Sequence, residues 1–149
     1  MDIELCKQDI KRHEGEVLEI YKDSLGYKPL GVGHLCQPND PEYDWEVGTS
    51  VSQEVVDMYY EDDFDKHYKE AIHVFGSEED WDELPEVIQR VLVNMCFNLG
   101  GSRLSKFRNM LKACRNHDWK TMAIEMEDSR WFNQVGGRSR ELQLMVLGA

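Results

Sequence analysis

Two carboxylic acids near the start of the chain, Glu14 and Asp23, are the residues whose types and spacing could do chemistry. Glu14 falls at the end of a predicted helix, where the negative end of the helix dipole disfavours an ionised carboxylate. Eight residues separate it from Asp23, which lies in a turn-rich segment. Two such groups facing one cleft can divide the acid and base roles at a glycosidic bond. Because the chain holds 29 acidic residues, the spacing alone fits two solvated carboxylates equally well.

The residues around this pair predict a small β element enclosed by helices. Apolar side chains recur at helical spacing over residues 3–13, which predicts a first helix ending near Glu14. Residues 17–35 combine short apolar runs with glycines and a proline, a pattern typical of a β-hairpin sheet. Residues 36–50 read as a polar loop, in which the aromatic rings of Tyr43 and Trp45 could contact a substrate or a partner. Ser52 is a candidate N-cap for a long helix that continues to about Val74.

The remainder of the chain is expected to be helical after a polar break over residues 76–82. From Pro85 the sequence is apolar on nearly all sides of a helix, which indicates a central buried helix that Gly100 and Gly101 end. Three shorter helices are expected to follow, at Leu104–Cys114, Trp119–Met126 and Ser139–Leu147.

These elements predict an α+β fold, mainly α, in one domain covering residues 1–149. A β lobe over about 14–51 would be joined by a connecting helix over about 52–74 to a helical lobe. The helical lobe would comprise residues 75–149 together with the N-terminal helix. A cleft between two lobes is the natural place for a binding site.

The charge of the chain is strongly and unevenly negative. Its 17 Lys and Arg minus 29 Asp and Glu give −12, and residues 1–80 carry −14 (7 − 21) against +2 (10 − 8) for residues 81–149. Such a protein is repelled by nucleic acid and by anionic membranes, so neither is an expected partner. Residues 40–65 hold ten acids and no Lys or Arg. The candidate calcium loop at residues 39–44 lacks the central glycine and contains a proline, so we read the acidic run as a solvated face, a cation site of another kind, or an adaptation to salt.

The four cysteines predict neither a zinc site nor a cofactor. Cys6, Cys36, Cys96 and Cys114 form no CxxC pair and no His/Cys ligand spacing. Cys96 and Cys114 fall in apolar helical patterns, where a buried reduced thiol is expected. The N-terminus lacks the apolar core of a signal peptide. We therefore expect the cytoplasm of the host or infected cell, with release by another factor, or association with a virion.

Residues 13–15, 20–27 and 30–35, in this order, resemble the active-site hairpin of the phage-type (T-even) lysozymes and endolysins. That family's signature is a Glu, eight residues, an Asp, five residues and a Thr, before a Gly-x-Gly-His strand. The spacing of Glu14 and Asp23 is the same. The resemblance extends along nearly the whole chain, through residues 13–15, 20–27, 30–35, 52–65, 94–100, 129–134 and Arg138.

The resemblance implies a phage-lysozyme-like fold and a monomeric muramidase acting on peptidoglycan without a metal or other cofactor. Glu14 would protonate the leaving oxygen between N-acetylmuramic acid and N-acetylglucosamine, and Asp23 would stabilise positive charge and orient the attacking water. The remaining roles that it implies are sugar contacts for Leu35, Phe97 and Asn98, an ion pair of Arg138 with Glu14, and a structural ion pair between His34 and Asp63.

The chain departs from the family at its Thr position, which is Pro29. In the inverting scheme the resemblance implies, the Thr hydroxyl holds the nucleophilic water, and proline has neither a hydroxyl nor a backbone N–H. Asp23 could hold the water alone, or Ser24 could substitute. The alternatives to a muramidase are a lysozyme-fold binding or structural protein with impaired catalysis, and a chitinolytic or transglycosylating enzyme.

The charge is a second departure. Many members of the family are basic, which suits an anionic cell wall, whereas a chain at −12 is repelled by such a wall over about 8 Å at physiological ionic strength. The charge fits a substrate with little net charge, a high-salt habitat, or a role other than wall digestion.

Overall fold

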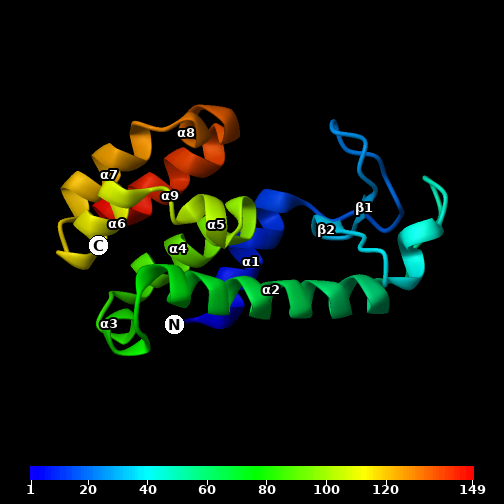
Figure 1. Cartoon of the computed structure of the whole chain (residues 1–149), viewed down its shortest axis with the longest axis horizontal. Helices are drawn as coiled ribbons and strands as arrows, with labels where there is room; N and C mark the ends of the chain where they lie inside the picture. The colour runs from blue at the N-terminus through cyan, green and yellow to red at the C-terminus, as the bar shows by residue number, and fades with distance from the viewer. The chain divides into compact units, whose positions relative to one another are not determined.

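The computed structural model describes all residues 1–149 and divides into two compact units (Figure 1). We call Lys7–Lys66 the small unit, and Met1–Cys6 together with His67–Ala149 the helical unit. Helices α1 (Ile3–Glu14) and α2 (Gln53–Phe75) each pass from one unit into the other. The mainly helical α+β class predicted from the sequence is confirmed.

The small unit contains a short antiparallel hairpin. Strands β1 (Pro29–Leu30) and β2 (His34–Leu35) pair with Pro29 opposite Leu35, and isolated bridges join Val17 to Gly31 and Glu19 to Ser50. The predicted sheet over residues 17–35 is therefore reduced to two-residue strands. Positive φ angles of 60° at Gly31 and 70° at Gly33 turn the chain out of the extended conformation, and Pro29 has no N–H for a ladder.

Gly31 also lies close to the Val56 side chain of helix α2. A Cβ atom at this position would lie 2.9 Å from Cγ1 of Val56, and the positive φ already disfavours any other residue. We expect Gly31→Ala to lower the free energy of unfolding by about 2–5 kcal/mol, the sum of backbone strain and overpacking. Chemical denaturation measures the change. Gly48→Ala, at φ 93° with open space around its Cβ, is the matched control and should cost only about 1–2 kcal/mol. Equal losses would exclude the contact with Val56 as the cause.

Local capping explains where α2 and the central helix α4 (Glu86–Leu99) begin and end. The Ser52 hydroxyl accepts a hydrogen bond from the Val55 N–H at 3.2 Å, which confirms the predicted N-cap of α2. Pro85 precedes α4, and Gly100 ends it at a φ of 82°. As predicted, α4 is buried on most sides, with eight of its residues in the core: Ile88, Gln89, Val91, Leu92, Val93, Asn94, Met95 and Cys96.

Shorter helices surround α4 in the helical unit. Helix α7 (Trp119–Glu127) packs against α6 (Arg108–Arg115) and α9 (Gly137–Leu147), and α9 also packs against α4 and α8 (Arg130–Val135) (Figure 1). Each of α7 and α8 begins at a capping side chain, since Asp118 accepts from the Thr121 N–H and Ser129 accepts from the Phe132 N–H.

Two predictions about the short elements are wrong. The expected helix Leu104–Cys114 is broken, because Phe107 has a ψ of 58° that separates α5 (Gly101–Leu104) from α6. The expected polar break contains helix α3 (Glu78–Asp82), which the Ser77 hydroxyl caps and the buried Trp81 anchors. Helix α3 has only about one turn and one buried apolar residue. Its sequence therefore shows no repeat of apolar residues at helical spacing. The predicted loop 36–50 likewise contains a 3₁₀ turn at Pro41–Asp44.

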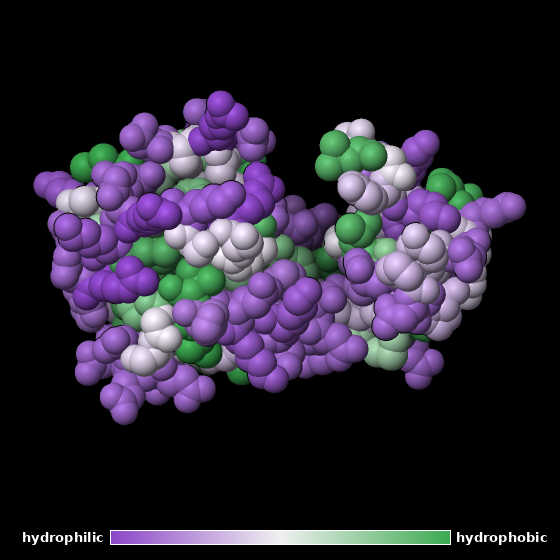
Figure 2. Space-filling model, viewed as in Figure 1, coloured by the Kyte–Doolittle hydropathy of each residue, from purple (hydrophilic) through white to green (hydrophobic).

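Hydrophilic residues cover most of the surface seen in Figure 2. None of the helices combines the length and the apolar composition that crossing a membrane requires.

Candidate active site

Glu14 is the last residue of α1, and its half-buried side chain lies against the hairpin turn of the small unit. A Cβ atom on Gly33 would lie 3.2 Å from Glu14 Oε1. The absence of a side chain at Gly33 therefore leaves room for the carboxylate. The helix end and the turn together fix the place of Glu14 within the small unit.

Asp23 organises the loop between α1 and the hairpin. Its Oδ1 atom accepts hydrogen bonds from the backbone N–H groups of Leu25 and Tyr27, both at 2.9 Å. The Asp23 N–H donates to the Tyr27 carbonyl, and the Gly26 N–H donates to the Asp23 carbonyl. Side chain and backbone thus close the same turn, which holds this carboxylate in one orientation.

Tyr21 lies close enough to both carboxylates to respond to their charges. Burial, followed by the negative charges of Glu14 and Asp23, raises the pKa of the Tyr21 hydroxyl above its usual value. The Tyr21 backbone N–H donates to the Pro29 carbonyl at 3.1 Å. The small unit therefore groups Glu14, Asp23 and Pro29 around one tyrosine. Tyr21 is not among the predicted site residues, since an aromatic residue in a hairpin ordinarily contributes to packing.

Pro29 is buried in β1, and its carbonyl is the partner of the Tyr21 N–H. Its ring offers no group that could bind water. At the position where the family pattern has a hydroxyl, the small unit therefore has a buried apolar ring.

A pocket of about 230 Å³ lies in the small unit, and neither Glu14 nor Asp23 is among the residues that line it. Leu35 lines it and keeps 39% of its surface exposed, which suits a contact with a sugar. Aromatic rings accompany it, because Tyr27 and Tyr43 also line the pocket. Trp45, the second aromatic residue expected to contact substrate, is not among the lining residues.

His34 is held between two carboxylates. Its Nδ1 atom lies 2.7 Å from Asp63 Oδ2 and its Nε2 atom lies 2.9 Å from Asp40 Oδ2, while the ring stacks on Tyr59 at 3.9 Å. Asp63 was the predicted partner of His34, whereas Asp40 was not predicted as a partner because it belongs to the acidic run of residues 40–65. Both ring nitrogens of His34 are engaged in these contacts, which is the geometry of a structural histidine.

The charges around His34 predict a pH-dependent stability. Burial lowers the pKa of His34, but its hydrogen bonds with Asp63 and Asp40 outweigh burial and the net shift is upward. The protonated ring therefore stabilises the fold fully below pH ~6.5, and this contribution is lost as the pH rises through the raised pKa. The pKa of Asp40 is lowered by hydrogen bonds to the Gln37 N–H and His34, against burial, so the stability that Asp40 contributes is lost on acidification.

We expect the free energy of unfolding of the wild type to fall as the pH rises above about 6.5 through the raised pKa of His34, and His34→Asn to flatten this dependence. The substitution should also cost roughly 1–3 kcal/mol near pH 6, because two partly buried carboxylates lose their partner. Denaturant titrations at several pH values measure both effects. His73→Asn, at an exposed histidine of α2, should leave the slope unchanged. A slope that persists in His34→Asn would assign it to another group.

The other predicted site residues lie in the helical unit. Asn98 Oδ1 accepts a hydrogen bond from Trp131 Nε1 at 2.7 Å, which fixes the orientation of its amide. Arg138 Nε donates to Asn94 Oδ1 at 2.9 Å, and Phe97 is half-buried at the end of α4. The pairing of Arg138 with Glu14 and the sugar contacts of Phe97 and Asn98 stay predictions.

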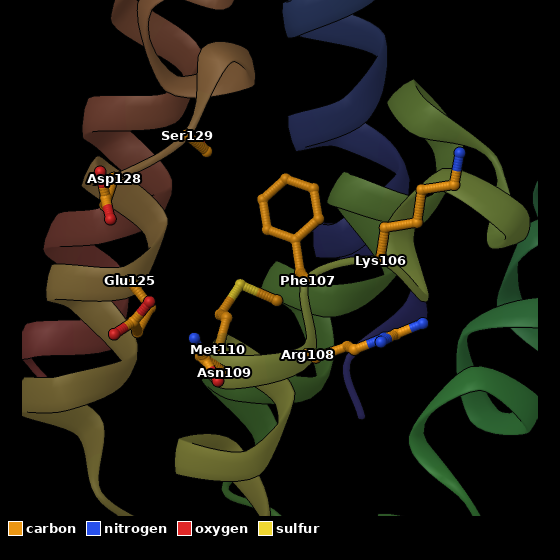
Figure 3. A pocket seen from close by; sticks show the side chains of 8 residues that line it. All are labelled: Lys106, Phe107, Arg108, Asn109, Met110, Glu125, Asp128 and Ser129. Atoms are coloured by element: carbon orange, nitrogen blue, oxygen red, sulfur yellow. The ribbon is translucent and has the colours of Figure 1, made fainter.

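A second pocket, of about 270 Å³, opens in the helical unit (Figure 3). Phe107 and Met110 supply its apolar wall, and charged side chains surround them from α6, α7 and the adjoining loops. None of the predicted site residues lines this pocket.

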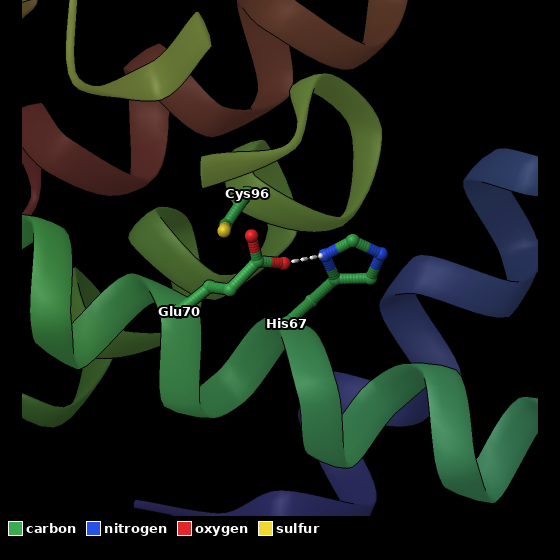
Figure 4. Close-up of side chains that lie close together, drawn as sticks. All are labelled: His67, Glu70 and Cys96. Carbon is green, nitrogen blue, oxygen red and sulfur yellow. Dashed lines mark ion pairs between the residues drawn. The ribbon is translucent and has the colours of Figure 1, made fainter. Parts of the chain in front are cut away.

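The residues that could hold a metal are also in the helical unit. Ligand atoms of His67, Glu70 and Cys96 lie within 4.8 Å of one another (Figure 4). Local spacing in the sequence does not reveal this group, because Cys96 is 26 residues from Glu70 along the chain.

Comparison with known proteins gives consistent matches along the chain. The sequence model of the family described as phage lysozyme matches residues 11–146. The chain is 30% identical to the probable T4-type lysozyme 2 of Dictyostelium discoideum, over 91% of this chain and 89% of that protein. It is 28% identical to the probable T4-type lysozyme 1 of the same organism, with the same coverage. It is 27% identical to the pre-baseplate central spike protein Gp5 of Enterobacteria phage T4, over 93% of this chain and 27% of that protein.

Proposed function

The chain belongs to the phage lysozyme family, and we therefore propose that it is a glycoside hydrolase that cleaves peptidoglycan between N-acetylmuramic acid and N-acetylglucosamine. The observation that carries the proposal is the grouping of Glu14 and Asp23 around Tyr21 in the small unit. Glycosidic hydrolysis uses a pair of carboxyl groups that flank the bond, and Glu14 and Asp23 supply such a pair from separate elements.

In this proposal Glu14 is the general acid. It donates its proton to the glycosidic oxygen as the bond to the anomeric carbon breaks, so the leaving sugar departs as an alcohol. Gly33 has no side chain, so it leaves room for the Glu14 carboxyl group beside the turn. The ion pair of Arg138 with Glu14 that the resemblance implies is part of this proposal.

Asp23 is the carboxylate that stabilises the positive charge developing on the sugar ring and orients water. Its Oδ1 atom closes the Leu25–Tyr27 turn, so we assign the role toward water to Oδ2. The pocket beside Leu35, Tyr27 and Tyr43 would receive a sugar ring, with Phe97 and Asn98 as the contacts from the helical unit.

Mass spectrometry of the digestion products tests the proposed reaction. Purified peptidoglycan incubated with the wild type at several salt concentrations should release muropeptides with reducing N-acetylmuramic acid ends, and Glu14→Gln should release them at least about 10²-fold more slowly. Reducing N-acetylglucosamine ends would indicate a different bond specificity. Equal products from both proteins would overturn the assignment of Glu14.

A second candidate function rests on Pro29. The buried proline removes the hydroxyl that would hold water, and this favours a lysozyme-fold binding or structural protein with impaired catalysis. Sedimentation with insoluble peptidoglycan separates the two. Cosedimentation without released products would support the binding protein, whereas release of muropeptides would exclude it.

We also propose where in the infected cell or the phage particle the protein acts. We place the protein in the cytoplasm of an infected cell, with release by another factor, or in a virion. The similarity to a phage spike protein supports the second setting. Detection of the chain by mass spectrometry in purified particles would distinguish them.

A further inference from the structure

Three side chains with different ligand atoms meet between α2 and α4 in the helical unit (Figure 4). His67 and Glu70 stand three residues apart on one face of α2, and Cys96 points toward the Glu70 carboxylate from α4. A ring nitrogen, a carboxylate oxygen and a thiol sulfur all lie within 4.8 Å of one another. None of the three belongs to the carbohydrate site described above.

Neighbouring residues hold the ligand side chains in place. The Phe97 ring meets the His67 ring edge-on, with centroids 5.1 Å apart. A Cβ atom on Gly101 would lie 2.8 Å from Glu70 Oε2, so the carboxylate fits closely against the glycine backbone. Packing on one side of these side chains reduces the conformational freedom that they would lose on binding an ion.

The polar atoms that face one another here are not satisfied by hydrogen bonds. His67 Nδ1 and Glu70 Oε1 are 2.7 Å apart and form an ion pair when the ring is protonated. Both atoms are nevertheless buried without a hydrogen bond of acceptable geometry. Buried polar atoms without hydrogen-bond partners are uncommon in native proteins and call for an explanation, of which an ion is one.

We propose that His67, Glu70 and Cys96 bind one divalent transition-metal ion, with Zn²⁺ as the best fit and a water molecule as the fourth ligand. Imidazole nitrogen, carboxylate oxygen and thiolate sulfur are the three ligand types that Zn²⁺ takes in proteins. Ca²⁺ and Mg²⁺ require oxygen ligands and fit the trio poorly. The carboxylate and the thiolate together balance the charge of the ion.

The geometry requires a small adjustment. Ligand atoms of a tetrahedral zinc site lie about 3.3–3.7 Å apart, given bonds of about 2.0–2.3 Å. The separation of 2.7 Å between His67 and Glu70 must therefore widen, which rotation of the Glu70 side chain allows because 35% of it is exposed. On binding, the Cys96 S–H bond breaks, its proton passes to solvent, and the sulfur electron pair binds the metal.

A bound ion would join α2 to α4 next to Phe97 and so stabilise the folded helical unit. Because the ligands converge only in the folded chain, the metal binds the native state in preference to the unfolded one. At a free metal concentration 100-fold above the dissociation constant, the unfolding temperature should rise by roughly 5 °C or more.

Cobalt substitution is the test, because Co²⁺ bound to thiolate has a charge-transfer band that Zn²⁺ lacks. Reduced, metal-free full-length protein titrated with Co²⁺ should develop this band to saturation at one equivalent, and Zn²⁺ should abolish it. Cys96→Ser should lose the band. Glu70→Gln should keep the thiolate and weaken Co²⁺ binding by about tenfold or more. The matched controls are Cys114→Ser, a buried thiol of the same unit, and His73→Asn, an exposed histidine of α2, and both should bind Co²⁺ like the wild type.

Several outcomes would overturn the proposal. One is the absence of a thiolate band in the wild type at saturating Co²⁺. Another is a band that survives Cys96→Ser, which would assign it to a different cysteine. If Cys96→Ser does not fold, Glu70→Gln decides, and unchanged Co²⁺ affinity in that variant would reject the site. These measurements do not involve glycosidase activity, so their results test the metal site independently of the proposed function.

Discussion

Glu14→Gln is expected to reduce muropeptide release by about 10²–10⁴-fold while the protein stays folded. Glutamine has nearly the shape of glutamate, so the side chain can still lie against Gly33, where a Cβ would be 3.2 Å from Oε1. It has no proton to donate at the pH of the reaction, so the leaving sugar would have to depart as an alkoxide. The rate of release of reducing ends, followed at saturating substrate, measures the loss.

The matched control for this variant is Glu19→Gln. Glu19 is an exposed acid of the same unit, so its substitution changes the net charge of the chain by the same amount. Activity close to that of the wild type is expected. If both variants lost activity equally, the cause would be the change in the net charge of the chain and not the loss of a proton donor. A fully active Glu14→Gln would mean that another group protonates the leaving oxygen.

The long elements of the fold could be predicted because their signals repeat. Helix α4 has apolar residues on most sides over four turns, with Pro85 before it and Gly100 after it, and the predicted bounds agree with Glu86–Leu99. Helix α3 could not be predicted in this way, since it lasts one turn and only Trp81 anchors it. Periodicity needs at least two turns to be visible.

The candidate site could be predicted only where the resemblance supplied a spacing. It identified Glu14 and Asp23, and the family match confirms the resemblance itself. It did not identify contacts that arise when distant segments meet. Asp40 joins His34 across the loop, and Cys96 joins His67 and Glu70 across two helices. Such contacts depend on tertiary packing, and a single sequence carries no local pattern for them.

The departure at Pro29 leads to the second large expected effect. Pro29→Thr should raise the rate of muropeptide release by up to about 10²–10⁴-fold, the usual contribution of a group that positions a proton-transferring water. The backbone can accept threonine, because the Pro29 carbonyl keeps its hydrogen bond from the Tyr21 N–H and threonine is favoured in strands. Replacing the proline should cost about 0.4–1 kcal/mol of stability, since the unfolded chain gains freedom.

Pro29→Val is the control that isolates the hydroxyl. Valine has the branched shape of threonine and restores the same backbone N–H, but it cannot hydrogen-bond a water molecule. If the hydroxyl holds the nucleophile opposite Glu14, the threonine variant gains activity and the valine variant stays at the wild-type rate. Equal gains in both variants would assign the effect to removal of the proline ring from β1. If the threonine variant is no faster than the wild type, Asp23 holds the nucleophilic water without help from a hydroxyl at position 29. The reaction of this chain would then not require the threonine of the family pattern.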